Sequence, residues 1–125
     1  MADWPLISDL GPLGALPTVP RLARGFVSVT LSSWGLDTLT DITELLVSEL
    51  STNVVRAATT ADGGLRYDNE GKIPLLWIRL LSDHVRLMIE VWDTLPAAFG
   101  ASIANRFACT TLATAVKSRD WLPSP

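Results

Sequence analysis

Two hydrophobic periods follow one another along this chain, a helical one in its first half and a strand-like one in its second half. From Val19 to Trp34 the apolar residues recur at roughly helical spacing, which predicts a first helix. Pro20 suits the first turn of that helix, and Gly35 suits a C-terminal cap. The apolar stripe of the predicted helix consists of Leu22, Phe26, Val29 and Leu31.

A second helix is predicted to begin near Asp37 and Thr38, either of which offers an N-cap, and to end near Ala58. Asp41 and Glu44 lie close to the positive end of its dipole. Its apolar stripe is broad, so we expect the helix to be buried along most of its length. The stripe consists of Leu39, Ile42, Leu45, Leu46, Val47, Leu50, Val54 and Val55.

Two strands are predicted beyond the polar, turn-rich residues 59–73. Pro74 precedes an apolar run from 75 to 81, and residues 84–92 alternate after a tight connection at Ser82 and Asp83. The alternation points Val85, Leu87, Ile89 and Val91 one way, and Arg86, Met88, Glu90 and Trp92 the other. Two helices followed by an antiparallel hairpin with one covered face predict an α+β fold, a two-layer α/β sandwich.

The ends of the chain carry weaker patterns. Residues 1–18 are rich in proline and glycine and predict an extended or turning lead-in with room for one short strand. Residues 97–125 form a tail in which Phe99, Ile103 and Phe107 share helical spacing, so a helix is one reading of residues 101–117. We expect a single domain over 1–125, with its core in residues 19–96.

Composition narrows the class of protein. The hydrophobic content of 48% argues against disorder, yet no apolar run reaches the roughly 20 residues that a membrane helix needs. Asp3 and the early prolines do not suit a signal peptide, so we expect a cytoplasmic protein. The net charge is −3 and the basic residues are scattered, which argues against nucleic acid as a partner. One cysteine and one histidine cannot supply a structural zinc site.

Glu49 and Asn53 are four residues apart on the second predicted helix and therefore share one face. They interrupt an apolar stretch, and a buried carboxylate without a partner would be costly. From spacing alone, a partly exposed polar stripe with an ordinary Glu–Asn contact is the favoured explanation. Asp93 adds a third group, because the strand alternation puts it on the helix-facing side. Oxygen ligands converging at one edge of the sandwich would suit a Mg²⁺-bound phosphate, although a strand-ending turn residue is the alternative for Asp93.

Four segments of residues 4–96 resemble the GHKL superfamily, and within it the small bacterial regulatory proteins related to anti-sigma-factor serine kinases. G-A-L-P-T-V-P (14–20) and W-G-L (34–36) flank the first helix. L-L-V-S-E-L-S-T-N-V-V-R (45–56) resembles the N-box, and I-E-V-W-D (89–93) resembles the strand that leads into the G1 box. The resemblance implies a Bergerat-type ATP-binding fold, truncated or divergent at its C-terminal end.

The resemblance also implies a role for each candidate residue. Asn53 would coordinate the Mg²⁺ that bridges the phosphates of ATP, and Glu49 would be the general base for an attacking serine hydroxyl. Asp93 would accept a hydrogen bond from the adenine amino group. The implied protein is a serine/threonine kinase-like ATPase. Its implied partner is an anti-sigma-factor antagonist or a sigma factor.

The chain departs from that pattern after Asp93. Thr94 and Leu95 stand where a G1 box usually has glycines, and no glycine-rich G2 loop follows to cradle phosphates. The tail is therefore either a divergent lid or the product of a reading frame shifted near Pro96, which would leave a two-stranded remnant with an exposed edge. A second hypothesis follows from this: a non-catalytic interaction module that kept the fold and lost nucleotide binding. Such a module would use its exposed edge or its apolar tail to form a homodimer or to bind a regulator.

Overall fold

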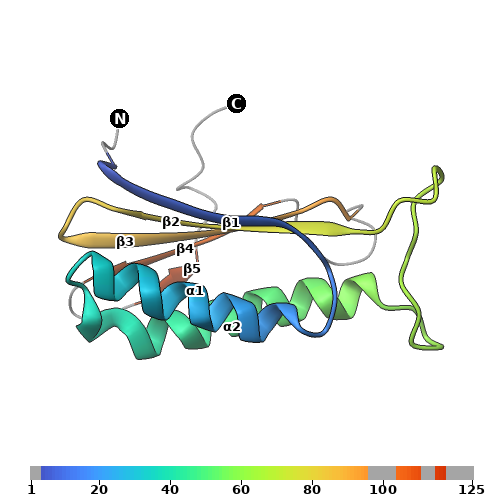
Figure 1. The fold of residues 1–125 in the computed structure, drawn as a ribbon, viewed down its shortest axis with the longest axis horizontal. Coiled ribbons are helices and arrows are strands. Elements are labelled where there is room, and N and C mark those ends of the chain that lie inside the picture. The colour runs from blue at the N-terminus through green and yellow to red at the C-terminus, as the bar shows by residue number, and fades with distance from the viewer. Residues whose placement is uncertain (1–3, 96–103, 111–114, 118–125) are drawn as a thin grey trace.

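The computed structural model describes residues 4–95, 104–110 and 115–117. An antiparallel sheet forms one layer, and two helices lie lengthwise across one of its faces (Figure 1). The strand order is β1-β2-β3-β4-β5, so every neighbour in the sheet is also a neighbour among the strands along the chain. The predicted α+β class, with helices on one side of an antiparallel sheet, is confirmed.

The first strand is longer than the lead-in that the sequence predicts. β1 spans Leu6–Gly14 and pairs antiparallel with β2 (Leu75–Ser82), with an irregularity between Leu10 and Leu13. Gly11 lies in this irregular part with a φ of +127°, and a Cβ there would come within 2.9 Å of the carbonyl oxygen of Leu76. Proline and glycine therefore mark a break inside a strand here and not the absence of a strand.

Helix α1 spans Val19–Ser33, close to its predicted bounds, with a proline in its first turn. Gly35 follows in the left-handed region with a φ of +71°, which confirms the predicted cap. The buried stripe differs from the predicted one, because Leu22 and Val29 are exposed and only Leu31 of the four is fully buried. The buried residues are Val19, Ala23, Val27, Thr30 and Leu31. No charged residue interrupts this buried stripe. The exposed stripe, which contains Leu22 and Val29, lies next to the charged Arg21 and remains in solvent.

Helix α2 spans Thr40–Ala58 after a short 3-10 helix, η1 (Asp37–Leu39). The predicted caps are wrong: the residue at the N-cap of α2 is Leu39, and neither η1 nor α2 has a side-chain cap hydrogen bond. The 3-10 turn explains this, because its residues Asp37 and Thr38 lie inside η1 and not at the start of α2. The buried residues of α2 are Thr43, Val47, Leu50, Ser51, Val54 and Ala58. Among the residues described here, neither helix is long and apolar enough to cross a membrane.

The predicted hairpin forms between β2 and β3 (Arg86–Asp93), with Ile78 opposite Val91 and Leu76 opposite Asp93. Leu87, Ile89 and Val91 are fully buried and belong to the same core as the helices, as the alternation predicts. Val85 is an exception, because it precedes β3 and is 61% exposed. Met88 and Glu90, predicted to face outward, are also buried, so the outer face of the sheet is covered at that point.

The tail contributes strands where the sequence suggested a helix. β4 (Ala104–Thr110) pairs antiparallel with β3, and β5 (Ala115–Lys117) pairs with β4. The helical reading of 101–117 is therefore wrong where the structure describes the chain, and residues 101–103 and 111–114 lie outside the described residues. The edge of β3 offers unpaired backbone groups to which the tail can hydrogen-bond as a strand. This pairing is favoured over the weak helical pattern of three spaced apolar residues. The predicted two-stranded remnant is also wrong.

The Ser82–Arg86 turn depends on Asp83. Its Oδ1 accepts hydrogen bonds from the backbone nitrogens of Val85 (3.0 Å) and Arg86 (2.7 Å). Its Oδ2 pairs with the Arg86 guanidinium at 2.9 Å. These bonds let His84 adopt a left-handed φ of 73°, and they lower the pKa of Asp83 from 3.8 to about 2.

Replacing this carboxylate (Asp83→Asn) is expected to cost about 1–2 kcal/mol of unfolding free energy at pH 7. A lowered pKa means that the contribution of Asp83 is present above pH 3.8 and is lost as the pH falls through about 2. Urea denaturation of both proteins should therefore show a difference that shrinks between pH 5 and pH 2.5. A difference that stays constant over that range would contradict the assignment to the carboxylate charge.

Candidate functional site

Glu49 and Asn53 lie on the outward side of α2. Both side chains are exposed, while the buried stripe that includes Val47, Leu50 and Val54 faces the sheet. Their spacing of four residues does put them on one side of the helix, as predicted. Neither side chain makes a hydrogen bond or ion pair within the described part of the chain. In the structure, Glu49 and Asn53 therefore belong to an exposed polar stripe of α2. Both side chains are accessible to a ligand or a partner.

Asp93 is placed very differently. It ends β3 on the helix-facing side, and only 4% of it is exposed. Its Oδ1 accepts a hydrogen bond from the backbone nitrogen of Leu95 at 2.9 Å, whereas its buried Oδ2 has no hydrogen-bond partner among the described residues. Burial raises the pKa of Asp93, and the hydrogen bond from Leu95 opposes that shift. A buried acceptor without a donor is rare in proteins and indicates a group that a ligand could complete.

Glu49 lies at the middle of α2 and Asn53 one turn nearer its C-terminal end, while Asp93 ends β3. The C-terminal half of α2 and the end of β3 lie at the same end of the molecule (Figure 1). No hydrogen bond joins Asp93 to Glu49 or Asn53 among the described residues. Since Asp93 is inside and the other two are outside, only a ligand that reaches from the core edge to the flank of α2 would connect them.

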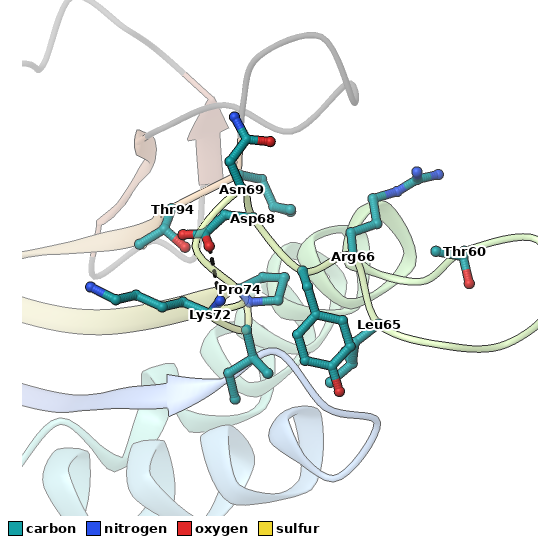
Figure 2. Close-up of a pocket in the computed structure, with 11 residues that line it drawn as sticks. Thr60, Leu65, Arg66, Asp68, Asn69, Lys72, Pro74 and Thr94 are labelled. Carbon is teal, nitrogen blue, oxygen red and sulfur yellow. Dashed lines mark hydrogen bonds between the residues drawn. The ribbon is translucent and has the colours of Figure 1, made fainter.

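Sequence reasoning missed a cavity at this same end. Its volume is about 530 Å³, within the usual range for small-molecule sites, and the loop between α2 and β2 forms most of it (Figure 2). Thr94 and Leu95, the residues directly after Asp93, complete the wall. The polar residues of 59–73 were the available signal, but a turn-rich loop alone does not reveal a cavity.

The polar groups around this cavity mostly serve the loop itself. Asp68 Oδ1 accepts hydrogen bonds from the backbone nitrogens of Glu70 and Lys72, each at 2.8 Å (Figure 2). Lys72 Nζ lies 3.2 Å from Glu70 Oε2 in an ion pair. The Nε of Arg66 donates a hydrogen bond to the carbonyl oxygen of Ala57 at 2.9 Å. The lining is therefore mixed in charge and held in shape by these bonds.

A second cavity, of about 620 Å³, lies over the outer face of the sheet. Trp77 and Trp92, which are opposite each other on β2 and β3, contribute to its wall together with Arg79 and Asp93. An ion pair between Arg79 and Asp9 (2.7 Å) crosses from β2 to β1 at its side. Asp93 lines this hollow and not the first cavity, whereas Glu49 and Asn53 line neither of the two.

The residues fit part of what ATP and Mg²⁺ require. The unpaired Asp93 oxygen suits an amino-group donor, and the Asn53 amide and Glu49 carboxylate supply oxygens for a cation that keeps several waters. In the part of the chain that the structure describes, no group of three His, Cys, Asp or Glu side chains could hold a metal by itself. Thr94 also differs from the glycine usual at this position of a G1 box, because it has a side chain whose Oγ1 accepts a hydrogen bond from the Leu75 nitrogen.

Comparison with known proteins adds no family to this description. No model of a known protein family matches the chain, and no curated protein matches it either. Function must therefore be inferred from the site itself.

Asparagine in place of Asp93 (Asp93→Asn) is expected to stabilise the ligand-free protein at neutral pH by about 1–3 kcal/mol, because it removes an unpaired buried charge. The raised pKa means that the favourable contribution of Asp93 is complete below pH 3.8 and is lost as the pH rises through the folded pKa. The two proteins should therefore converge near about pH 3 in urea denaturation. Equal stability at pH 7 would show that the carboxylate is not desolvated.

Proposed function

We propose that this chain is an ATP- and Mg²⁺-binding regulatory domain of the GHKL type, resembling the anti-sigma-factor serine/threonine kinases. The observation that carries the proposal is the buried Asp93 carboxylate, whose Oδ2 has no donor in the part of the chain that the structure describes. An adenine amino group would supply that donor and remove the cost of the unpaired oxygen. The same ligand could extend its phosphates toward the flank of α2, where Asn53 is exposed.

The chemistry at the phosphate end would fall to Asn53 and Glu49. Asn53 would hold the Mg²⁺ through its amide oxygen, and Mg²⁺ would neutralise charge on the phosphates. Glu49, one turn earlier on the same side of α2, would accept the proton of the attacking hydroxyl. Both side chains are exposed, which suits a substrate serine that belongs to another protein. A sigma factor regulator, such as an anti-sigma-factor antagonist, is the partner class that this proposal implies.

The order of elements supports the finer fold assignment. A strand, two helices and an antiparallel hairpin follow one another, and the N-box-like segment lies on α2 while the G1-like aspartate ends β3. This is the arrangement expected at the start of a Bergerat-type ATP-binding fold. We therefore extend the two-layer α+β description to that fold as part of the proposal.

A second function, a non-catalytic interaction module, is favoured by the residues after Asp93. Leu95 is buried in the core, and Thr94 is hydrogen-bonded to β2, where glycines would let a nucleotide approach the backbone. No glycine-rich phosphate loop occurs in the described residues. A chain that kept the sandwich but lost this loop would act through its surfaces alone.

A thermal-shift titration distinguishes the two functions. Under the first, ATP with Mg²⁺ should raise the melting temperature progressively, because a ligand that binds only the folded state stabilises it. The matched titrations are ATP with EDTA and Mg²⁺ alone, which should produce smaller shifts. Absence of any shift at millimolar Mg²⁺-ATP would reject nucleotide binding and leave the interaction module.

A further inference from the structure

Thr94 continues the pairing of β2 with β3 one residue past the end of β3. Asp93 lies opposite Leu76 in the register of the two strands, and the next pair is Thr94 with Leu75. The backbone nitrogen of Thr94 donates to the carbonyl oxygen of Leu75 at 3.0 Å. In a regular antiparallel pair the return bond would go to a backbone carbonyl. Here the Leu75 nitrogen donates to the Thr94 hydroxyl oxygen, Oγ1, at 3.0 Å, so the threonine side chain closes the ladder.

The closed ladder fixes the point at which the chain turns inward after β3. Thr94 itself is exposed and lies at the wall of the first cavity (Figure 2). Leu95, the next residue, is 3% exposed and packs in the core. The backbone nitrogen of Leu95 donates to Oδ1 of Asp93, two residues back, at 2.9 Å. The two bonds between Thr94 and β2 therefore set the position of the Leu95 N–H relative to Asp93.

That N–H determines the orientation of the Asp93 carboxylate. Rotation about the Cβ–Cγ bond of an aspartate has broad minima, so hydrogen-bond partners set the plane of the carboxylate. Oδ1 has the Leu95 nitrogen as its donor, while the buried Oδ2 has none among the described residues. The bond from Leu95 therefore decides which oxygen is left for a ligand and in which direction it is presented.

We propose that Thr94 is a positioning residue for base recognition by Asp93, and that its hydroxyl sets the preference of the site for an amino-substituted purine. This inference rests on the proposed nucleotide-binding function. Glycines after Asp93 would leave the carboxylate to be oriented by the ligand, whereas the bonds of Thr94 orient it beforehand. A preorganised acceptor discriminates strongly, because a ligand without the matching donor leaves it unpaired.

Affinities for ATP and inosine triphosphate, each with Mg²⁺, test this role, because inosine has a carbonyl oxygen where adenine has its amino group. The wild type is expected to bind ATP about ten- to a hundredfold more tightly. Thr94→Val keeps the β-branched shape and removes the acceptor, and it should fold because Thr94 is exposed. Its affinity for ATP should fall by about tenfold while its affinity for inosine triphosphate stays unchanged. Thr94→Ser restores the hydroxyl and should recover the wild-type ratio.

Ser82→Ala is the matched control, because it removes side-chain hydrogen bonds at the opposite end of the same hairpin. Ser82 Oγ donates to the carbonyl oxygen of Arg86 at 2.7 Å and accepts from the His84 nitrogen at 3.1 Å. This variant should have a lower Tm and an unchanged ratio of the two nucleotide affinities. An equal fall of the ratio in Ser82→Ala and Thr94→Val would make Thr94 a general stabilising residue and overturn the proposal.

Amide hydrogen exchange without nucleotide tests the positioning step separately. The Leu95 N–H should be protected in the wild type and in Thr94→Ser, and should exchange about tenfold faster in Thr94→Val. Equal exchange at Leu95 in the wild type and Thr94→Val would overturn the inference whatever the affinities are. A wild type that binds neither nucleotide would overturn the proposed function and the base preference with it. ATP binding with an unchanged affinity ratio in Thr94→Val would overturn this inference alone.

Discussion

Replacing Asn53 with alanine (Asn53→Ala) is expected to abolish the stabilisation of this protein by Mg²⁺-ATP. For the wild type, a ligand at one hundred times its Kd adds about 2.7 kcal/mol. In a domain of this size, each kcal/mol of stabilisation raises the Tm by roughly 3–6 °C. The variant should lose this shift because the amide is the proposed Mg²⁺ ligand. Its Tm without nucleotide should stay within the change of about 0.5 kcal/mol that is usual for an exposed side chain.

Thr52→Ala is the matched control, since Thr52 is the neighbouring residue on α2 and has no part in the proposed site. It should retain the full nucleotide shift. If Asn53→Ala retains that shift as well, the assignment of the metal ligand is wrong although nucleotide binding stands. If the wild type shows no shift, the proposed function itself fails.

Truncation of Ile78 to alanine should destabilise the fold by about 2–5 kcal/mol, the range for removing a large aliphatic side chain from a core. Ile78 is fully buried in β2, with Leu10 of β1 on one side and Val91 of β3 on the other. The cavity would therefore open in the middle of the sheet, where three strands limit collapse around it. Urea denaturation at pH 7 measures the change in unfolding free energy.

The comparison for Ile78→Ala is Val85→Ala, because Val85 is 61% exposed at the hairpin and should change the stability by less than about 0.5 kcal/mol. A loss below about 1 kcal/mol at Ile78 would mean that the β1–β2–β3 core is not packed as described. Both variants truncate a β-branched apolar side chain to alanine. A difference in their unfolding free energies therefore reports the effect of burial and not of apolar character.

The structure changes how the candidate site is understood. In the sequence, Glu49 and Asn53 look like polar residues inside a buried helix, whereas the folded protein exposes both and buries Asp93 instead. The physical reason is that α2 needs only one stripe for the sheet, and the remaining apolar positions such as Leu45 stay in solvent. Of the three candidate residues, the aspartate at the end of β3 is therefore the one with a buried oxygen that no described residue satisfies, and it determines which end of the sandwich a ligand would occupy.

Local patterns determined much of this protein. The bounds of α1, the end of α2, the β2–β3 hairpin and the helix-facing position of Asp93 follow from period, turn residues and alternation, which act over a few residues. Only the tertiary structure decided which stripe of α1 is buried, because that helix has two apolar stripes. It also decided that the lead-in and the tail become strands, because the edges of β2 and β3 supply backbone partners that no local pattern contains.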